Sequence, residues 1–413
     1  MMGDNIEHVI TYWVLWLKFH SVALTGFEVI SHWLPYLLLS VTFGQFAQRY
    51  DCRRLIQGAQ ILFMLVSITW GILFATNSLT VWEACVLLVL HGGAGALWGP
   101  AEQLMLNDFA EPADLPGAIR MNATFRNLGI LLGPAVGSLL LLGLGPVAGI
   151  FTNVVFYLPM TLLMFRTPYT GHTRDLARAA ALAAESEAVA ADIPEPATPR
   201  AGGGILGAIR TLREVRITPI VVSMLALSGL IALFVGGALQ VSMPAFAVAL
   251  GSGSAGLAYG VLLFANGVGG VVGGFLLEAI GVLKPNALTA FVSTLLFGIL
   301  ILIFATTPSY VVAVIALVLA GMANIASLSV SQSIVQLEAK PEDRGRLVGL
   351  YGTVASGFRT GSGVLIAALG AFAGVRGSLM LSAALLTLGA VIVGIGMWRT
   401  RHRQVLSADG QPG

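Results

Sequence analysis

Long stretches without a single charged residue restrict this chain more than any other feature of its sequence. Soluble domains carry about 25% charged residues, whereas this chain has only 10%, and its charges lie outside a few apolar runs. A membrane-spanning helix needs about 20 apolar residues, so these runs are long enough for roughly one, two, three and two spans. The chain is therefore predicted to be embedded in lipid, with its longest spans in residues 55–82, 127–165, 217–277 and 285–337.

Shorter apolar segments complete a set of about twelve predicted spans. Turn-forming residues such as Gly145-Pro146 divide the longer runs into separate helices. We therefore expect an all-α membrane protein, whose remaining spans lie near residues 31–46, 81–100, 347–374 and 378–398, with a shortened first span near residues 6–17.

Basic residues alternate between the loops in a way that predicts how the chain is oriented. Arg53, Arg166 and Arg344 belong to a larger set that occupies every second loop, whereas the opposite loops hold only Lys18 and Arg376. Positively charged loops stay on the cytoplasmic side of a membrane. The central linker and both termini are thus predicted to be cytoplasmic.

A long linker separates two groups of spans. Residues 167–216 are rich in Ala, Glu, Pro and Gly and cannot bury a core, although residues 204–216 have the spacing of a short amphipathic helix lying on the membrane. The predicted domains are a six-helix half, this linker, a second six-helix half and a cytoplasmic tail, at residues 1–166, 167–216, 217–398 and 399–413.

An internal repeat relates the two groups of spans. The segment AEPAD at residues 110–114 recurs as AKPED at residues 339–343. Gly44 and Arg54 flank the loop after the second span, and residues 274 and 284, again Gly and a basic residue, flank the loop after the eighth. Both pairs are offset by about 230 residues, and parallel repeats of this kind occur in transporters. The sequence therefore predicts two related halves in the same orientation.

The loop after the second span contains a motif of glycine, acid and arginines. Arginines at this place can bond carbonyls or acids at neighbouring helix ends and so latch a gate. A basic loop that only fixes the topology is the alternative. The predicted gating residues are Gly44, Arg49, Asp51, Arg53 and Arg54.

A glycine stripe marks the fifth span. Gly129, Gly133 and Gly137 recur every four residues, so they line one helix face and permit close approach of another helix, while Pro134 can kink the span. The stripe either seals the cytoplasmic side of a carrier or serves ordinary helix packing.

These two motifs, together with residues 341–352, are similar to those of one transporter family. The chain resembles the major facilitator superfamily and, within it, the bacterial proton-driven exporters that include the enterobactin-exporter group. Gln48 departs from the loop motif, which usually has Asp there. The resemblance implies the major facilitator fold in a bacterial inner membrane and alternating access between the halves. It also implies an antiporter that exports small amphipathic molecules, such as drugs or siderophores, and a first helix that is incomplete here.

Charged residues within spans are expensive in lipid and usually face a cavity or a partner. Asp4 and Glu7 lie three residues apart on one face of the first span, and we expect at least one of them to carry the coupling proton. The alternative is that they cap a frayed helix start. A neutralising cation nearby would let a solute displace the proton, because burial raises a carboxyl pKa and a cation lowers it.

Four further residues are candidates for the proton path or the substrate cavity. Arg359 lies deep in the eleventh span and faces either the cavity or a structural ion pair, whereas Arg126 lies near the membrane edge and can snorkel to the cytoplasm. His91 near the middle of the fourth span can titrate or serve structurally, and Glu28 belongs to the second span.

The sequence also limits the class of function. Because it has no Walker A lysine pattern, the chain is not itself an ATP-driven pump. We expect a transporter and not an enzyme, with a small-molecule substrate, protons and the lipid bilayer as partners. No cofactor, metal or nucleic acid is expected, and one chain with two halves can act as a monomer. A facilitator or importer, and a non-transporting sensor or decayed carrier, remain as alternatives.

Overall fold

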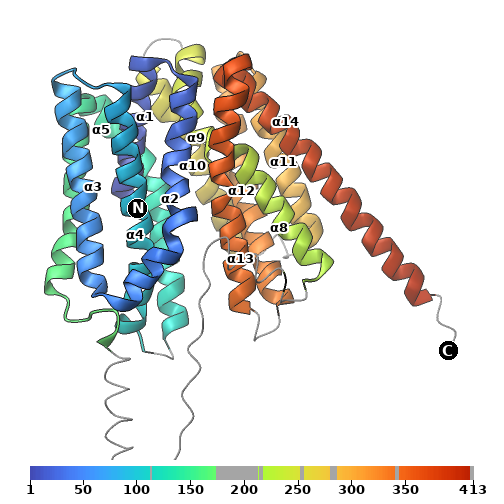
Figure 1. The fold of residues 1–413 in the computed structure, drawn as a ribbon. Helices are drawn as coiled ribbons and strands as arrows, with labels where there is room; N and C mark the ends of the chain where they lie inside the picture. Colours follow the sequence, from blue (N-terminus) through green and yellow to red (C-terminus); the bar gives the residue numbers. More distant parts are fainter. Residues whose placement is uncertain are drawn as a thin grey trace, which may run out of the picture.

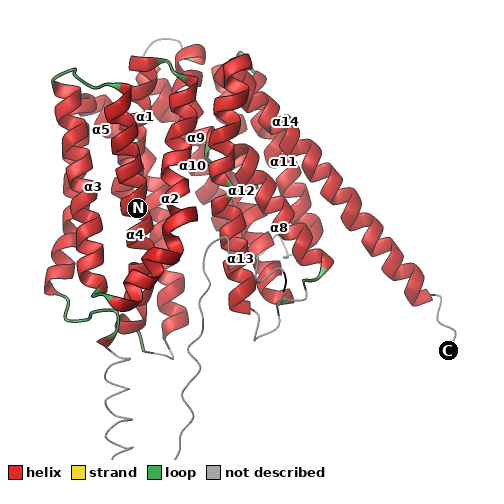
Figure 2. Ribbon diagram, viewed as in Figure 1, coloured by secondary structure: helices red, strands yellow, loops and turns green. Residues whose placement is uncertain are grey.

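Helices and their connections make up the part of the chain that the computed structural model describes, and no strand occurs in that part (Figure 2). The described residues are 1–111, 114–173, 213, 217–251, 255–279, 286–339 and 344–409.

The first half consists of a bundle whose central member is α1 (Figure 1). Residues 3–13 of α1 are all buried, so the other helices cover this helix on every side. Its polar side chains are therefore turned to protein and not to lipid. The helices of this half are α1 (Met2–Phe19), α2 (Val22–Arg49), α3 (Cys52–Ala75), α4 (Val81–Phe109) and α5 (Leu115–Arg166).

The second half lies beside the first in the same bundle arrangement (Figure 1). Its first span is interrupted by the short π-helix η1, which separates α8 from α9. The elements are α8 (Pro219–Ile231), η1 (Ala232–Gly236), α9 (Ala238–Leu250), α10 (Ala255–Ala279), α11 (Ala287–Thr306), α12 (Tyr310–Glu338), α13 (Arg344–Gly357) and α14 (Arg359–Asp409).

Two of these helices are too long to be single spans. At 1.5 Å per residue, the 52 residues of α5 would extend about 78 Å, far more than the roughly 30 Å of a hydrocarbon core. Gly145 breaks α5 with φ 76° and ψ 173°, and Gly374 breaks α14 with φ 70° and ψ 174°. Only glycine adopts this backbone region without strain. Each glycine reverses the chain between two spans.

The described residues contain 9 helices long and apolar enough to cross a membrane. Two of them, in α5 and in α13–α14, are divided by the glycines just described and count as two spans each. Helix α1 contains three charged residues, Asp4, Glu7 and Lys18, and is not among those 9 helices. With α1 included, the structure has about twelve spans, as the sequence predicts. The predicted all-α membrane fold is confirmed.

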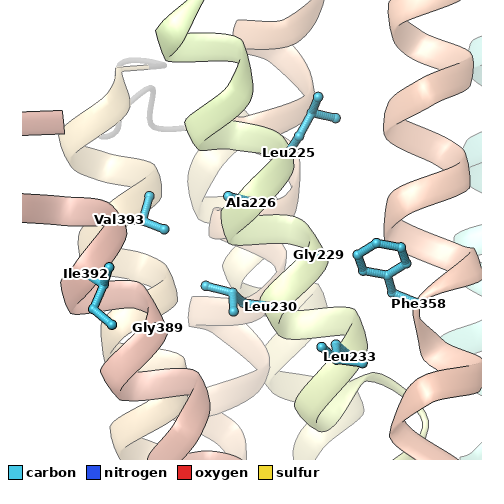
Figure 3. A pocket seen from close by; sticks show the side chains of 9 residues that line it. All are labelled: Leu225, Ala226, Gly229, Leu230, Leu233, Phe358, Gly389, Ile392 and Val393. Carbon is cyan, nitrogen blue, oxygen red and sulfur yellow. The ribbon is translucent and has the colours of Figure 1, made fainter. Parts of the chain in front are cut away.

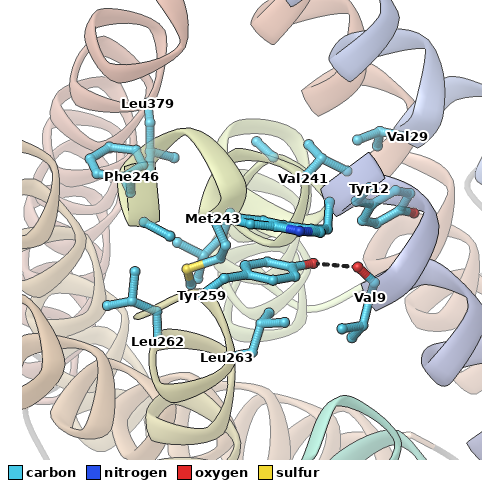
Figure 4. Packing of buried hydrophobic residues seen from close by; sticks show 14 of the residues in the cluster. Val9, Tyr12, Val29, Val241, Met243, Phe246, Tyr259, Leu262, Leu263 and Leu379 are labelled. Carbon is cyan, nitrogen blue, oxygen red and sulfur yellow. Dashed lines mark hydrogen bonds between the residues drawn. The ribbon is translucent and has the colours of Figure 1, made fainter. Parts of the chain in front are cut away.

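The halves are joined through α1, α2 and α5 of the first and α9, α10 and α14 of the second. Tyr259 of α10 donates a hydrogen bond from its hydroxyl to the backbone oxygen of Val9 in α1, at 3.1 Å (Figure 4). Its ring also stacks on Trp13 of α1 at a centroid distance of 5.2 Å. Tyr259 lies one turn after the start of α10, on the side of the bundle opposite the linker. The halves are thus tied together on that side.

Some predictions concern residues that the structure does not describe. The proposed amphipathic helix at 204–216 and most of the linker 167–216 fall there, as do residues 341–343, residue 284 and the last residues of the tail 399–413. Several helix bounds differ from the sequence prediction. The helices α1 and α2 begin earlier than the apolar segments at 6–17 and 31–46, α4 continues beyond residue 100, and the predicted span 347–374 is divided between α13 and α14.

Candidate functional site

Two acids of α1 and a histidine of α4 form a buried cluster inside the first half. His91 lies with Nε2 2.7 Å from Asp4 Oδ1 and Nδ1 2.9 Å from Glu7 Oε1. Glu7 and His91 are only 2% and 3% exposed. The imidazole therefore bridges two carboxylates, and the three groups that the sequence singles out separately form one unit.

Polar side chains from two more helices extend this cluster. Ser67 of α3 donates a short hydrogen bond to the second carboxylate oxygen of Glu7. Asn153, in the second part of α5, donates to Ser67 Oγ at 3.4 Å. Both side chains are fully buried. Buried polar groups in a membrane protein are costly unless they are paired, so this chain of hydrogen bonds fixes the orientation of Glu7 and, through it, of His91.

Two further histidines lie against the cluster. His8 is one turn after Asp4 on α1, with Nδ1 3.9 Å from Asp4 Oδ1, and its ring lies 4.7 Å from that of His32 in α2 and 4.8 Å from that of His91. Sequence reasoning did not identify His8 or His32. A signal for His8 was present, because Asp4 and His8 are four residues apart and share a face of a helix. No signal was available for His32, whose place depends on how α2 packs on α4.

That packing depends on Gly92, which follows His91 directly. A Cβ at Gly92 would lie 3.0 Å from the carbonyl carbon of Ser31 and 3.1 Å from the Cα of His32, closer than ordinary van der Waals contact. The absence of a side chain therefore lets the backbones of α2 and α4 meet. As a result, His32 and His91 are neighbours, with ring centroids 5.9 Å apart.

Glu28 and Arg359 lie outside the hydrogen-bonded cluster. Glu28 of α2 is 3% exposed, and within the described residues no basic side chain pairs with it. Arg359 opens α14 and lies with its guanidinium carbon 4.8 Å from the centre of the Trp33 ring of α2, across the boundary between the halves. Among the described acids none lies within ion-pair distance of Arg359. The structural ion pair considered for this residue is thus not observed in that part of the chain.

Arg126 of α5 pairs with an acid near the linker side of the first half. Its Nη1 lies 3.9 Å from Glu102 Oε2 of α4, and its guanidinium lies 5.5 Å from the Trp98 ring. Arg126 is therefore placed apart from Asp4, Glu7 and His91.

The loop motif forms a compact set of hydrogen bonds at the start of α3. Asp51 accepts from the backbone nitrogen of Arg53 at 2.9 Å and pairs with its guanidinium at 2.7 Å. Arg53 also donates to the carbonyl oxygen of Thr167 at the end of α5, at 2.8 Å. Arg49 and Arg54 are exposed. One arginine of the motif thus binds a neighbouring helix end, as the sequence suggested, whereas two others face outward.

Asp51 lies in the loop between α2 and α3, just before the membrane span that begins at Cys52. Burial acts to raise the pKa of Asp51, but the hydrogen bonds from the side chain and backbone of Arg53 outweigh it and hold that pKa below its ordinary value. Asp51 therefore stays charged at neutral pH.

The glycine stripe of α5 faces α1. A Cβ at Gly129 would lie 3.2 Å from the backbone nitrogen of Met2, and one at Gly137 would lie 3.1 Å from the Cα of Ile6. A Cβ at Gly133 would lie 3.1 Å from the carbonyl oxygen of Met2 and 2.5 Å from the Cβ of Asn5. The stripe is thus the surface on which the helix that carries Asp4 and Glu7 rests. Pro134 lies within the same stretch of α5.

A separate apolar groove lies between α8 and the last helix (Figure 3). It has a volume of about 350 Å³ and is lined by apolar residues that include Leu230, Leu233, Phe358 and Ile392. None of the charged site residues lines it. A groove without polar groups cannot orient a solute, so we place the functional site at the buried cluster of the first half.

Comparison with known proteins identifies the family of this arrangement. The family model of the Major Facilitator Superfamily matches residues 7–358, with a second match at residues 225–412. The chain belongs to the major facilitator superfamily. It is therefore a transporter and not an enzyme, and the family that the sequence resembles is confirmed.

Solved structures agree with the fold. A crystal structure of a bacterial homologue of the human lysosomal transporter Spinster, inward-facing and occupied, is similar with a TM-score of 0.69 and 15% identity, over 95% of this chain and 94% of that one. The nucleoside transporter NupG gives a TM-score of 0.65 and 12% identity, over 95% of this chain and 96% of that one. At these identities the likeness concerns the fold alone.

A curated relative is similar over a shorter region. The staphyloferrin A transporter of Staphylococcus aureus (strain NCTC 8325 / PS 47) is 23% identical over 141 residues. This match covers 34% of the present chain and 36% of the length of that transporter. The chain thus matches about a third of this relative.

Proposed function

We propose that this member of the superfamily is a proton-coupled exporter of small amphipathic molecules, working by alternating access between its two halves. The observation that carries the proposal is the bridge of His91 between Asp4 and Glu7, which is buried in the helix at the centre of the first half. Ionisable groups at such depth in a membrane protein are usually part of an ion or substrate path.

The surroundings of α1 support a role in coupling. Its acid-bearing face is linked to α3, α4 and α5 through hydrogen bonds, and its other contacts include the glycine stripe of α5 and Tyr259 of the second half. A change of protonation at the cluster would therefore act on the helix that contacts both halves. The stripe would serve as the sliding surface for that movement, in keeping with its likeness to the antiporter motif.

Arg359 is the proposed contact for the solute. It brings a cation to the boundary between the halves, and Trp33 offers an aromatic face beside it. A cation and an aromatic ring together suit an amphipathic molecule with an acidic or polar head. The partial likeness to a staphyloferrin A transporter favours siderophore-like molecules within this class.

The loop charges support placement in a bacterial inner membrane, with the linker and both termini in the cytoplasm. In that orientation, the hydrogen bond between Tyr259 and Val9 lies on the outer side. We further propose that the loop motif with Asp51 and Arg53 latches the inner side by its bond to the end of α5.

Purified protein in liposomes with an internal pH-sensitive dye tests the proposal. Addition of a transported drug or siderophore should drive protons in the opposite direction, and an imposed pH gradient should accelerate solute movement against its concentration gradient. Arg359→Ala should abolish drug resistance in cells without their own pumps while membrane levels stay unchanged, and Arg399→Ala, at an exposed arginine, is the matched control. Solute movement that ignores the pH gradient would instead indicate a facilitator.

A further inference from the structure

Four side chains from three helices place metal-binding atoms around one buried point. Asp4, His8, His32 and His91 each offer one oxygen or nitrogen, and these four atoms all lie within 4.8 Å of one another. The chain has six histidines, so half of them converge at this place. We propose that these four residues bind one divalent transition-metal ion, a site that the sequence pattern did not predict.

The spacing of the donors suits such an ion. Tetrahedral zinc with bonds of about 2.0–2.1 Å needs ligand atoms roughly 3.3 Å apart. Asp4 Oδ1 lies 2.7 Å from His91 Nε2 and 3.9 Å from His8 Nδ1, so the observed separations bracket this value. Small side-chain rotations would close the shell, because the four residues already surround the same point.

The chemistry of the donors selects the class of ion. Imidazole nitrogens favour zinc, copper, iron, nickel and related transition metals, whereas calcium and magnesium prefer oxygen ligands. Three imidazoles and one carboxylate therefore fit the first class. Two acids, Asp4 and Glu7, lie at the site and can supply the negative charge that a buried divalent cation needs.

The groups behind the donors are arranged as in metal sites. A metal-bound histidine commonly donates its second ring nitrogen to a carboxylate, which fixes the ring and makes it a better ligand. His91 Nδ1 lies 2.9 Å from Glu7 Oε1, and Ser67 holds the other oxygen of Glu7. His91 Nε2 is thereby directed at Asp4 and is the nitrogen available to an ion.

A hydrogen-bond network alone does not account for the two other histidines. His8 and His32 have ring contacts with one another and with His91, but within the described residues neither donates or accepts a side-chain hydrogen bond shorter than 3.5 Å. The Nδ1 atom of His32 is buried and has no hydrogen-bond partner there. An unpaired buried polar atom costs about 1–3 kcal/mol. A bound cation would remove this cost by coordinating the imidazoles.

The test uses the full chain, freed of any histidine tag and placed in phospholipid nanodiscs. Co²⁺ is titrated and followed by visible absorption, since tetrahedral Co²⁺ with nitrogen ligands is strongly coloured, and the bound metal is counted by mass spectrometry. We expect one ion per chain, displaced by Zn²⁺. His8→Gln and His32→Gln should each remove the coloured complex, whereas Glu7→Gln should keep one ion with about 10–100-fold weaker affinity.

The control is His20→Asn. His20 is exposed at the end of α1 with φ 45°, a conformation that asparagine tolerates, so this variant should bind Co²⁺ like the wild type. Failure of the wild-type chain to bind an equivalent of metal would overturn the proposal, whatever the variants do. Wild-type affinity in both His8→Gln and His32→Gln would also overturn it.

The metal site concerns the same cluster as the proposed transport function, but its test is independent of that function. Binding in nanodiscs needs no gradient and no solute. A chain that binds Co²⁺ but exchanges no solute for protons would support the metal site and contradict the exporter. A chain that exchanges solute for protons but binds no Co²⁺ would contradict only the metal site.

Discussion

Substitution of Gly92 by alanine should separate two helices that the site needs in contact. The added Cβ would meet the carbonyl carbon of Ser31 at 3.0 Å and the Cα of His32 at 3.1 Å, and both are backbone atoms that cannot rotate away. We expect α2 to move away from α4, which carries His32 away from His91. Overpacking of this kind costs about 1–3 kcal/mol.

Gly93 provides the matched comparison, because a Cβ at that position has no heavy atom within 4 Å. Both substitutions gain the same helix propensity, about 1 kcal/mol for alanine over glycine. The difference between the free energies of unfolding of the two variants therefore measures the effect of the steric clash at Gly92 alone. Gly93→Ala should be neutral or slightly stabilising, and Gly92→Ala should be about 1–3 kcal/mol less stable than Gly93→Ala.

The assay is reversible unfolding in mixed micelles, with proton-coupled transport in liposomes as the second readout. Transport should fall in Gly92→Ala and persist in Gly93→Ala. If the two variants unfold at the same free energy and transport equally, the close approach of α2 and α4 is not what positions His32, and the reasoning is refuted.

Two further predictions concern the glycine stripe and the loop motif. Gly133→Ala should displace α1 and reduce transport, because the added Cβ would lie 2.5 Å from the Cβ of Asn5. Gly143→Ala on the same helix is the control, because its Cβ meets no atom within 4 Å and should leave transport unchanged. Equal transport activities of the two variants would contradict this prediction. Since the folded pKa of Asp51 is lowered, its pairing with Arg53 is complete above the ordinary carboxyl pKa of about 3.9 and is lost as the pH falls through the folded value. The measurement is backbone hydrogen exchange of residues 167–173, corrected for the intrinsic exchange rate. Exchange should accelerate only below about pH 4 in the wild type, but already at neutral pH in Asp51→Asn. Identical exchange in the two proteins would contradict the latch.

The spans were predictable from the sequence because each rests on a local property. Charge-free runs must lie in lipid, and the break at Gly145 was marked by its neighbour Pro146. The helix ends were less predictable. The polar residues Asp4 and Glu7 interrupt the apolar signal of the first span, yet α1 continues through them because the surrounding helices bury them.

Of the site, the sequence revealed the members but not the arrangement. Asp4, Glu7 and His91 were identified as charges or a histidine within spans, and their contact required the register of α1 against α4, which no local pattern encodes. His32 shows this most clearly. Its position depends on a glycine 60 residues later in the chain, and only the packed structure relates the two.

The glycine reversals in α5 and α14 have a consequence for how the protein reaches the membrane. Gly374 lies 229 positions after Gly145, and the two have nearly the same backbone angles. At each of them two spans follow one another without a long hydrophilic segment between, and Arg376 is the one charged residue close to either glycine. The translocation machinery thus has at most one charged side chain to pass across the bilayer at these points, so each pair of spans can enter lipid together, as a preformed hairpin. Two such hairpins at equivalent places would make membrane insertion of the two halves follow the same sequence of steps.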